Sequence, residues 1–384
     1  MKRNLLLTPG PTKIPPEVCE ALGRPIIHHR TPQFQDNLKS AIEGLQYVFQ
    51  TENDVYLLVA SGTGAMEASV VNLLSPGEKA ITVEGGKFGE RWTEICQAYG
   101  IATEVIEVEW GTAVKPEQIA DLLEKNPDVK AVFTTLSETS TGVVSDIEAI
   151  AKVVQKTDAV LVVDAISGLG VTDLQMDKWG VDVVVAASHK RFMLPPGLAF
   201  VAVNDKATAM INKSTNARFY WDFRKSKKAF EQTDTPFTPA IGIVVALNES
   251  LRIIKEAGRE NLLEQYAKLA RGTRAAALAL GFELLAEDSC ISNVLTAIKL
   301  PDTVDGGKVV KTMRDTYGIS VAGGQGHLKG KIIRIAHMGC VSEEDIIEGI
   351  ECLQTVLAEQ GYSFPANAGV DAAKNEFSKT QTHA

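Results

Sequence analysis

Two apolar runs in the middle of the chain each lead into a residue that could do chemistry. Residues 160–163 precede Asp164, and the largely apolar residues 181–187 precede His189 and Lys190. Short runs of this kind predict buried parallel strands, and in an open α/β sheet the chemistry lies beyond the carboxyl ends of the strands. A lysine and an acid at two such ends are the pair that pyridoxal 5′-phosphate needs, the lysine for an imine and the acid for the pyridinium nitrogen.

Lys190 is the candidate for the imine-forming amine. It follows an apolar strand, and Pro195, Pro196 and Gly197 come soon after it, which restricts the chain around the lysine. Burial there would lower the pKa of the amine and leave it unprotonated, as imine formation requires. Most lysines that follow a strand are surface residues. The apolar strand before Lys190 and the prolines and glycine after it are what favour a chemical role here.

Asp164 is the candidate for the acid that keeps the cofactor's ring nitrogen protonated. An aspartate at a strand end is commonly a cap or turn former, and residues 165–168 (Ala-Ile-Ser-Gly) suit a turn. The functional interpretation gains weight because Lys190 follows one β–α–β step later. The side chain of Ile166 could pack beneath the ring.

A Ser-Gly-Thr-Gly turn at residues 61–64 stands between an expected strand and an expected helix. Backbone N–H groups at a helix start, together with the helix dipole, suit the cofactor phosphate. The same turn would also serve as an ordinary helix cap. The chain has no G-x-G-x-x-G motif, and residues 326–331 are not a Walker loop because Ile332 stands where Ser or Thr is needed.

Arg334 interrupts an otherwise apolar strand expected at 331–336. An unpaired buried guanidinium is costly, so this arginine needs a carboxylate, either from the protein or from a ligand. From the residues alone, a protein carboxylate and a ligand carboxylate are equally good candidates for the partner of Arg334.

These residues must be positioned by an alternation of helices and strands that begins near residue 33. A helix is expected at 34–49, and strands are expected at 55–60, 79–83, 103–108, 129–136, 159–163, 181–187 and 198–203. Repeated β–α alternation with short connections predicts a mainly parallel sheet covered on both faces. The expected fold class is therefore α/β.

The pattern changes after about residue 255. A long amphipathic helix at 260–280 precedes strands at 292–300 and 331–336 and helices at 305–317 and 343–358, which predicts a smaller α+β domain. The last twenty residues are polar and low in large apolar groups, so a flexible tail is expected. The predicted division is an N-terminal arm at 1–14, a large cofactor-binding domain at 15–255, a small C-terminal domain at 256–364 and the tail at 365–384.

Composition excludes several classes of protein. The 384 residues are 45% hydrophobic and carry a formal net charge of −9, which fits a folded enzyme and argues against nucleic-acid or anionic-membrane partners. No apolar run reaches the length of a membrane span or a signal-peptide core. Five scattered cysteines without C-x-x-C favour free thiols in a reducing cytoplasm and no bound metal.

Taken together, the motifs resemble the class V aminotransferases of the alanine–glyoxylate and serine–pyruvate type over nearly the whole chain. The resembling segments are 8–11, 43–51, 61–68, 86–91, 138–142, 163–167, 190–197 and 333–335. The resemblance implies an aspartate-aminotransferase-like fold (pyridoxal phosphate fold type I) and a homodimer. It also implies ping-pong transfer of an amino group from a small amino acid, alanine or serine, to glyoxylate or another 2-oxo acid.

The resemblance implies roles for individual residues. Phe88 would stack on the cofactor ring, and Thr139 would hydrogen-bond the ring hydroxyl. Arg334 would take the α-carboxylate of the substrate. The implied phosphate ligands are Gly62, Thr63 and, from the partner subunit, Thr235 and Thr238.

Two positions depart from the family pattern. The residue before the lysine is usually Gln and is His189 here, whose imidazole can still donate to the phosphate. Position 235 is Thr where the animal enzymes have an aromatic hydroxyl, so this contact from the partner subunit would be shorter.

Two alternatives to transamination remain. Similar cyanobacterial chains are known as the small, tritium-exchange subunit of a soluble hydrogenase, but scattered cysteines do not supply the clustered thiolates that nickel–iron or iron–sulfur sites need. Residues 188–190 (Ser-His-Lys) also resemble cysteine desulfurases. Residues 318–332 contain no cysteine and Cys340 comes after Arg334, which makes desulfuration the weaker alternative.

Overall fold

The centre of the fold is a seven-stranded sheet, and the computed structural model describes residues 4–379 of the chain. The strand order is β2-β10-β9-β8-β5-β3-β4, with β10 antiparallel to both neighbours and the other strands parallel to one another. The α/β class with a mainly parallel sheet is confirmed. The strands are β2 (Asp54–Leu58), β3 (Lys79–Glu84), β4 (Ala102–Glu107), β5 (Val129–Thr135), β8 (Val160–Asp164), β9 (Val183–Ala187) and β10 (Ala199–Val203).

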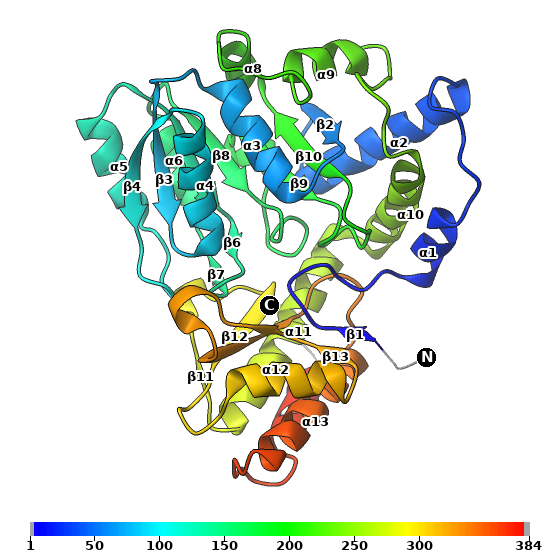
Figure 1. Cartoon of the computed structure of the whole chain (residues 1–384), viewed down its shortest axis with the longest axis vertical. Coiled ribbons are helices and arrows are strands. Elements are labelled where there is room, and N and C mark those ends of the chain that lie inside the picture. Colours follow the sequence, from blue (N-terminus) through cyan, green and yellow to red (C-terminus); the bar gives the residue numbers. More distant parts are fainter. Residues whose placement is uncertain (1–3, 380–384) are drawn as a thin grey trace.

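Helices cover both faces of this sheet (Figure 1). Successive side chains of a strand point to opposite faces, and in β8 the alternation divides Val162 from Leu161 and Val163, which belong to two separate apolar cores. The core around Val162 includes residues of α3 (Gly62–Leu73) and α4 (Lys87–Ala98). The other core includes residues of α2 (Pro32–Phe49), α5 (Pro116–Lys125), α6 (Ile147–Val154) and α10 (Ile241–Ala257). Burial on both faces explains why these strands read as continuous apolar runs.

A second, smaller sheet lies in the lower half of Figure 1. Its order is β11-β12-β15-β14, and all of its neighbouring strands are antiparallel. Gly258 separates α10 from α11, and the architecture changes after it. The domain boundary predicted near residue 255 lies close to this glycine and stays a prediction. The elements are β11 (Glu283–Leu284), β12 (Leu295–Lys299), β14 (Ala322–Gly323), β15 (Ile332–Ala336), α11 (Arg259–Ala279), α12 (Gly306–Asp315) and α13 (Glu343–Glu359).

The N-terminal segment joins the two halves of the molecule. Its strand β1 (Leu5–Leu6) pairs in parallel with β13 (Ile319–Ser320) beside the small sheet. The segment then reaches the large domain, where the N–H of Thr12 donates to the carbonyl oxygen of His189 at 3.2 Å. The predicted arm is therefore fixed at both ends, and Figure 1 shows it in blue between the two halves.

The C-terminal segment differs from the flexible tail that its polar composition predicts. Helix α14 (Ala368–Ser378) buries Val370, Ala373 and Phe377, whose spacing of three and four residues places them on one helical face. Phe377 packs against α11 so closely that a Cβ atom on Gly272 would lie 2.2 Å from its ring. These three apolar residues on one face pack α14 against the rest of the small domain. Residues 380–384 of the predicted tail lie outside the described residues.

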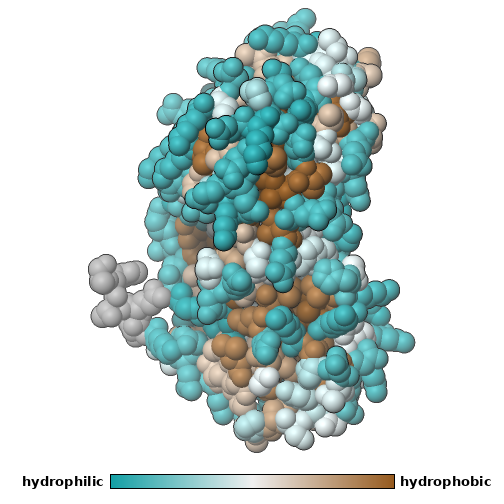
Figure 2. Space-filling model, turned by 90° about the vertical axis from the view of Figure 1, so that its left-hand side faces the viewer, coloured by the Kyte–Doolittle hydropathy of each residue, from teal (hydrophilic) through white to brown (hydrophobic). Residues whose placement is uncertain are grey.

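The molecular surface in Figure 2 shows one face of the protein. Hydrophilic side chains cover most of its upper half, and apolar side chains gather in its lower half and in a smaller area above. Across the described part of the chain, no helix combines the length and the apolar character needed to cross a bilayer.

Candidate active site

The large sheet brings the carboxyl ends of β2, β3, β5, β8 and β9 to one edge, because these strands are parallel. Asp164 ends β8 and lies in register with Val185 of β9. Lys190 follows three residues after the end of β9, and Gly62 begins α3 beyond the end of β2. The topology thus places these three residues at the edge where an α/β sheet binds its ligands.

Lys190 is buried, and its amine faces the N-terminal segment. The Nζ atom donates to the carbonyl oxygen of Pro9 at 2.6 Å and lies 6.0 Å from the centre of the Phe88 ring. Burial lowers the pKa of Lys190 to about 8, although the negative charge of Asp164 opposes this shift. The amine therefore loses its proton far closer to neutral pH than an exposed lysine does.

Asp164 is the acidic counterpart of this amine and is equally buried. Its Oδ1 atom accepts a hydrogen bond from the N–H of Ile166 at 2.8 Å. Burial raises the pKa of Asp164 to about 7, and the negative charge of Glu138 adds to that effect, while the positive charge of Lys190 opposes it. No lysine, arginine or histidine in residues 4–379 forms an ion pair with Asp164, and a cation bound at this carboxylate would favour its ionised form.

Arg334 is buried, and its guanidinium donates hydrogen bonds to backbone carbonyl oxygens. Its Nε and Nη2 atoms donate to the oxygen of Gly323 at 2.9 and 2.7 Å, and Nη1 donates to the oxygen of Thr139 at 2.5 Å. The only side-chain acceptor found for it in the described chain is Gln325, at 3.4 Å. Burial lowers the pKa of Arg334 to about 10. Within residues 4–379 no carboxylate forms an ion pair with Arg334, which leaves the guanidinium charge available to a ligand.

The Ser-Gly-Thr-Gly turn begins α3 and leaves its end open. Ser61 is the N-cap residue, and its side chain makes no capping hydrogen bond to the first N–H groups of the helix, although its carbonyl oxygen accepts from the N–H of Gly64 at 2.9 Å. Gly62 is packed against Ile166, and a Cβ atom there would lie 2.5 Å from the Ile166 Cδ1 atom. Thr63 accepts a hydrogen bond from Arg91 at 3.2 Å, and that guanidinium lies 4.8 Å from the centre of the Phe88 ring.

His189 lies beside Lys190 and has an unused ring nitrogen. Its Nδ1 atom is buried and has no hydrogen-bond partner in the described chain. Burial lowers the pKa of His189 to about 4, and the charge of Lys190 adds to this shift. The imidazole is therefore neutral at physiological pH and can donate one hydrogen bond to a ligand.

Thr235 and Thr238 are not brought to Lys190 within one chain. They line a small pocket together with Tyr220, Trp221 and Phe237. The Thr235 hydroxyl donates to the carbonyl oxygen of Phe237 at 2.8 Å. In the part of the chain that the structure describes, neither threonine hydrogen-bonds to Lys190 or to the α3 turn, so their predicted contact from a partner subunit stays a prediction.

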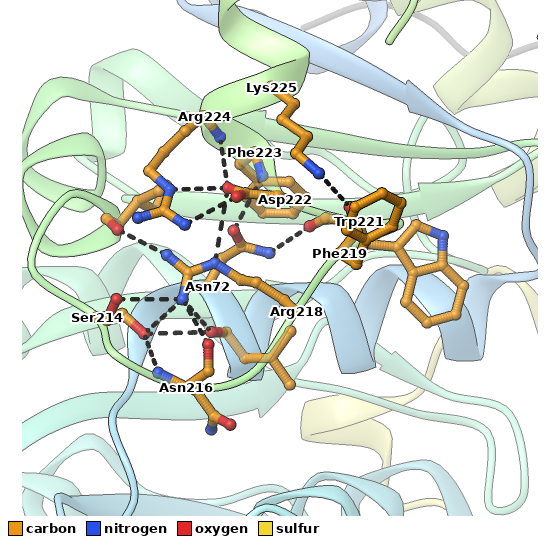
Figure 3. Close-up of polar contacts among 12 residues, drawn as sticks. Asn72, Ser214, Asn216, Arg218, Phe219, Trp221, Asp222, Phe223, Arg224 and Lys225 are labelled. Carbon is orange, nitrogen blue, oxygen red and sulfur yellow. Dashed lines mark hydrogen bonds and ion pairs between the residues drawn. The ribbon is translucent and has the colours of Figure 1, made fainter. Parts of the chain in front are cut away.

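A polar cluster behind α3 was not found from the sequence (Figure 3). The buried side chain of Asn72 donates to the carbonyl oxygen of Trp221 at 2.6 Å and accepts from the N–H of Phe223 at 2.9 Å. Arg218 donates to four carbonyl oxygens, those of Val71, Ile211, Ser214 and Asn216. The cluster holds Trp221 beside the first turn of α3, where a Cβ atom on Gly64 would lie 3.2 Å from the indole. The one available signal was an asparagine inside a helix whose other residues are mostly apolar.

Comparisons with known proteins identify relatives of the whole chain. The family model "Aminotransferase class-V" matches residues 5–341. The "Soluble hydrogenase, small subunit" of Synechococcus sp. is 41% identical over 98% of this chain and 99% of its own length. The L-aspartate–glyoxylate aminotransferase of Paracoccus denitrificans is 35% identical over 98% and 97%. The crystal structure of ureidoglycine–glyoxylate aminotransferase from Bacillus subtilis superimposes with a TM-score of 0.95 at 27% identity and covers 99% of both chains.

Proposed function

The chain belongs to the class V aminotransferases, and we propose that it uses pyridoxal 5′-phosphate to transfer the amino group of a small amino acid to glyoxylate or another 2-oxo acid. The observation that carries this proposal is the buried pair at the sheet edge, the amine of Lys190 with a pKa lowered to about 8 and the carboxyl of Asp164 with a pKa raised to about 7. Glyoxylate is an acceptor in the names of relatives such as the Paracoccus enzyme, which supports it as a substrate here.

The unsatisfied groups of the site match the parts of this cofactor. The open end of α3 at Gly62 and Thr63 and the unpartnered Nδ1 of His189 suit the phosphate. Asp164 is a buried acid that forms no ion pair within residues 4–379, which leaves its carboxylate available to a protonated ring nitrogen. Phe88 and Ile166 present apolar surfaces near Lys190 and Gly62. The residues present therefore fit pyridoxal phosphate.

When bound, pyridoxal phosphate supplies an electron sink that stabilises negative charge at the Cα atom of an amino acid. The chain's own residues supply the rest. Lys190 Nζ would hold the cofactor through its aldehyde carbon and, when free, would accept the Cα proton of the amino acid, which a lysine with a pKa of about 8 can do at physiological pH. Asp164 would hold the proton on the ring nitrogen. Thr139 would contact the ring hydroxyl.

Arg334 selects substrates that carry a carboxylate next to the reacting carbon. Its hydrogen bonds to Gly323 and Thr139 fix the plane of the guanidinium before any ligand arrives. A carboxylate that binds there gains charge-assisted hydrogen bonds in a low-dielectric environment. Both the amino acid and the 2-oxo acid carry this group, so one arginine serves both halves of a ping-pong reaction.

The proposed enzyme is a homodimer. Thr235 and Thr238 would then reach the phosphate from the second copy of the chain. In support of this, within one chain they line a separate pocket and make no hydrogen bond to Lys190. Thr238 is exposed in the single chain and so is free to meet a neighbour.

The experiment that tests the proposal is a substrate panel with purified protein and added pyridoxal phosphate. Alanine, serine and aspartate are each paired with glyoxylate and with pyruvate, and the amino and oxo products are quantified. We expect glycine to form from glyoxylate with at least one donor in the wild type and not in Lys190→Ala. A wild type that forms no product from any pair, although it binds the cofactor, contradicts the proposed reaction.

A hydrogenase subunit is the second candidate, because the Synechococcus relative carries that name. The five cysteines are all free and lie apart, and in residues 4–379 no three or more His, Cys, Asp or Glu side chains gather where a metal could bind. Metal analysis of the purified protein, together with an assay of tritium exchange with and without pyridoxal phosphate, separates the two functions. Exchange that depends on the cofactor and on Lys190 supports transamination chemistry.

A desulfurase activity has less support than either. The thiol of Cys340 donates to the carbonyl oxygen of Lys13 at 3.4 Å, and burial raises the pKa of this thiol. A thiol with a raised pKa is a poor nucleophile.

A further inference from the structure

Glu138 is a buried carboxylate that caps a helix to which it does not belong. It ends β6 (Ser137–Glu138), and its Oε2 atom accepts from the N–H groups of Phe88 at 2.9 Å and Gly89 at 3.0 Å, in the first turn of α4. Its Oε1 atom accepts from the N–H of Ser140 at 3.0 Å and from the Ser140 hydroxyl at 2.6 Å. The same hydroxyl accepts from the N–H of Lys87 at 3.0 Å. Three successive N–H groups of α4 are therefore satisfied from one loop.

The sequence around α4 leaves space for this carboxylate. Gly86 is the N-cap residue of α4 and has no side chain to cap the helix itself. A Cβ atom on Gly86 would lie 2.3 Å from the Ser140 Oγ atom and 2.5 Å from the Glu138 Cδ atom. Any other residue at position 86 would displace the Glu138 side chain from the helix end.

Hydrogen bonds, and not an ion pair, hold the side chain of Glu138 in place. Only 5% of this residue is exposed, and no lysine, arginine or histidine in residues 4–379 forms an ion pair with it. The partial positive charge of the α4 N-terminus and four hydrogen bonds stabilise the carboxylate. Removing those bonds would leave the N–H groups of the first turn unsatisfied, so this turn depends on Glu138 for its position.

Both elements that Glu138 joins carry residues of the site. Phe88 lies in the turn that Glu138 caps, and its ring centre is 6.0 Å from Lys190 Nζ. Thr139 follows Glu138 directly, and its carbonyl oxygen accepts from Arg334 at 2.5 Å. One carboxylate thus connects the aromatic ring above the lysine with the segment that holds the arginine.

We propose that Glu138 is a positioning residue for the transamination reaction, which fixes the ring of Phe88 over the cofactor and, through the backbone of Thr139, the guanidinium of Arg334. This role rests on the proposed function, because it acts on the groups that would contact cofactor and substrate. The side-chain hydrogen bonds of Glu138 all go to Phe88, Gly89 and Ser140, so it would act through these neighbours. A purely structural cap would affect stability and leave catalysis unchanged, so the two roles can be separated by experiment.

The first experiment compares Glu138→Ala, Glu138→Gln and the control Asp182→Asn. Asp182 is likewise buried and accepts from the N–H of Leu161 and from Asn204, each at 2.8 Å, but it precedes β9 at the opposite end of the strand. For Glu138→Ala we expect kcat/KM to fall about 100-fold, as displacement of a positioned group by about 1 Å can cause. The circular dichroism of the bound cofactor should weaken. Glu138→Gln keeps an oxygen acceptor, so its kcat/KM and its cofactor dichroism should lie between those of the wild type and Glu138→Ala. Asp182→Asn should lower only the melting temperature.

A double-mutant cycle tests whether Glu138 acts through Phe88. If it does, Glu138→Ala should lower kcat/KM about 100-fold in the wild type and only about threefold in a Phe88→Ala background, because interacting residues are not additive. An equal loss in both backgrounds overturns the role of Glu138 in fixing Phe88. A Glu138→Ala variant that loses melting temperature but keeps the wild-type kcat/KM and cofactor dichroism overturns the proposal.

Two further outcomes are distinguishable. If Glu138→Ala does not fold, Glu138→Gln decides, and unchanged kinetics and dichroism in that variant overturn the role. A wild type that binds no pyridoxal phosphate contradicts the proposed function, whereas an active wild type whose Glu138 variants behave like Asp182→Asn contradicts only the positioning role.

Discussion

The amine of Lys190 donates a hydrogen bond to the carbonyl oxygen of Pro9 at 2.6 Å, across 181 positions of sequence. The next residue, Gly10, lies against the same side chain, and Thr12 donates from its hydroxyl to the carbonyl oxygen of Lys190 at 2.7 Å. The N-terminal segment therefore encloses the lysine on one side and holds its backbone. A residue that must act as nucleophile and base gains positional accuracy from this arrangement.

Gly10→Ala should reduce activity more than it reduces stability. Gly10 has φ +131°, and a Cβ atom there would lie 2.6 Å from both Cδ and Nζ of Lys190. We expect kcat to fall at least about tenfold, since small displacements of a catalytic group are costly. The control is Gly77→Ala, which also has a positive φ, +87°, but has no atom within 4 Å of the added Cβ. Gly77→Ala should lose about 1 kcal/mol of stability and keep its activity. Equal kinetics for both variants would contradict the steric role of Gly10.

The rate at which the cofactor-free protein binds pyridoxal phosphate should rise with pH through about 8. The unprotonated amine is the nucleophile, and the pKa of Lys190 is lowered to about 8 mainly by burial. Asp164 raises that pKa, so Asp164→Asn should shift the midpoint to lower pH. Stopped-flow absorbance from pH 6 to 10 measures both profiles. A midpoint near the ordinary lysine pKa, or a shift to higher pH in Asp164→Asn, would contradict this electrostatic account.

Arg334→Ala should raise KM for both the amino acid and the 2-oxo acid. The lost charge-assisted hydrogen bonds are worth about 1.5–3 kcal/mol, which corresponds to an increase of about 10- to 150-fold. Arg334→Lys keeps the charge but loses the two-pronged geometry, so its KM should lie between those of the wild type and Arg334→Ala. Cofactor absorbance should be unchanged in both variants. A change in kcat alone, with KM as in the wild type, would exclude the carboxylate role.

Asn72→Ala should destabilise the fold by about 2–3 kcal/mol, because it leaves the carbonyl of Trp221 and the N–H of Phe223 without partners in a buried environment. Chemical denaturation monitored by far-ultraviolet circular dichroism gives the free energy of unfolding. The matched control is Asn212→Ala, whose side chain is exposed. If the two variants lose the same small amount, the cluster in Figure 3 does not anchor the segment that carries Trp221.

The sequence predicts the elements that are apolar throughout and the residues at their ends. β9 lies within the run expected to be a strand, and β8 extends one residue beyond its expected run. Asp164 ends β8 and Lys190 follows β9, at the same edge of the sheet because parallel strands share that edge. Helix α14 was missed because Val370, Ala373 and Phe377 are its few apolar residues in a polar segment. These three residues stabilise the helix only when they pack against α11. The antiparallel direction of β10 has no sequence signal, since a buried strand reads alike in either direction.

Contacts between backbone and distant side chains could not be predicted. The carbonyl oxygen of Pro9 is the same chemical group in every residue, so only the path of the chain brings it to Lys190. Glu138 lies in a segment already identified by its resemblance to the family, yet its capping role requires α4 to begin beside it. Phe88 was named from that resemblance and Arg334 from its place in an apolar strand, and the link between them through Glu138 and Thr139 appears only in three dimensions.

The most direct test of the central claim is borohydride reduction of the purified protein after incubation with pyridoxal phosphate, followed by peptide mass mapping. The proposed function predicts that the cofactor becomes irreversibly attached to the peptide that contains Lys190, and that Lys190→Ala carries no such attachment. Attachment at a different lysine, or none in the wild type, would contradict the assignment of Lys190 as the residue that holds the cofactor.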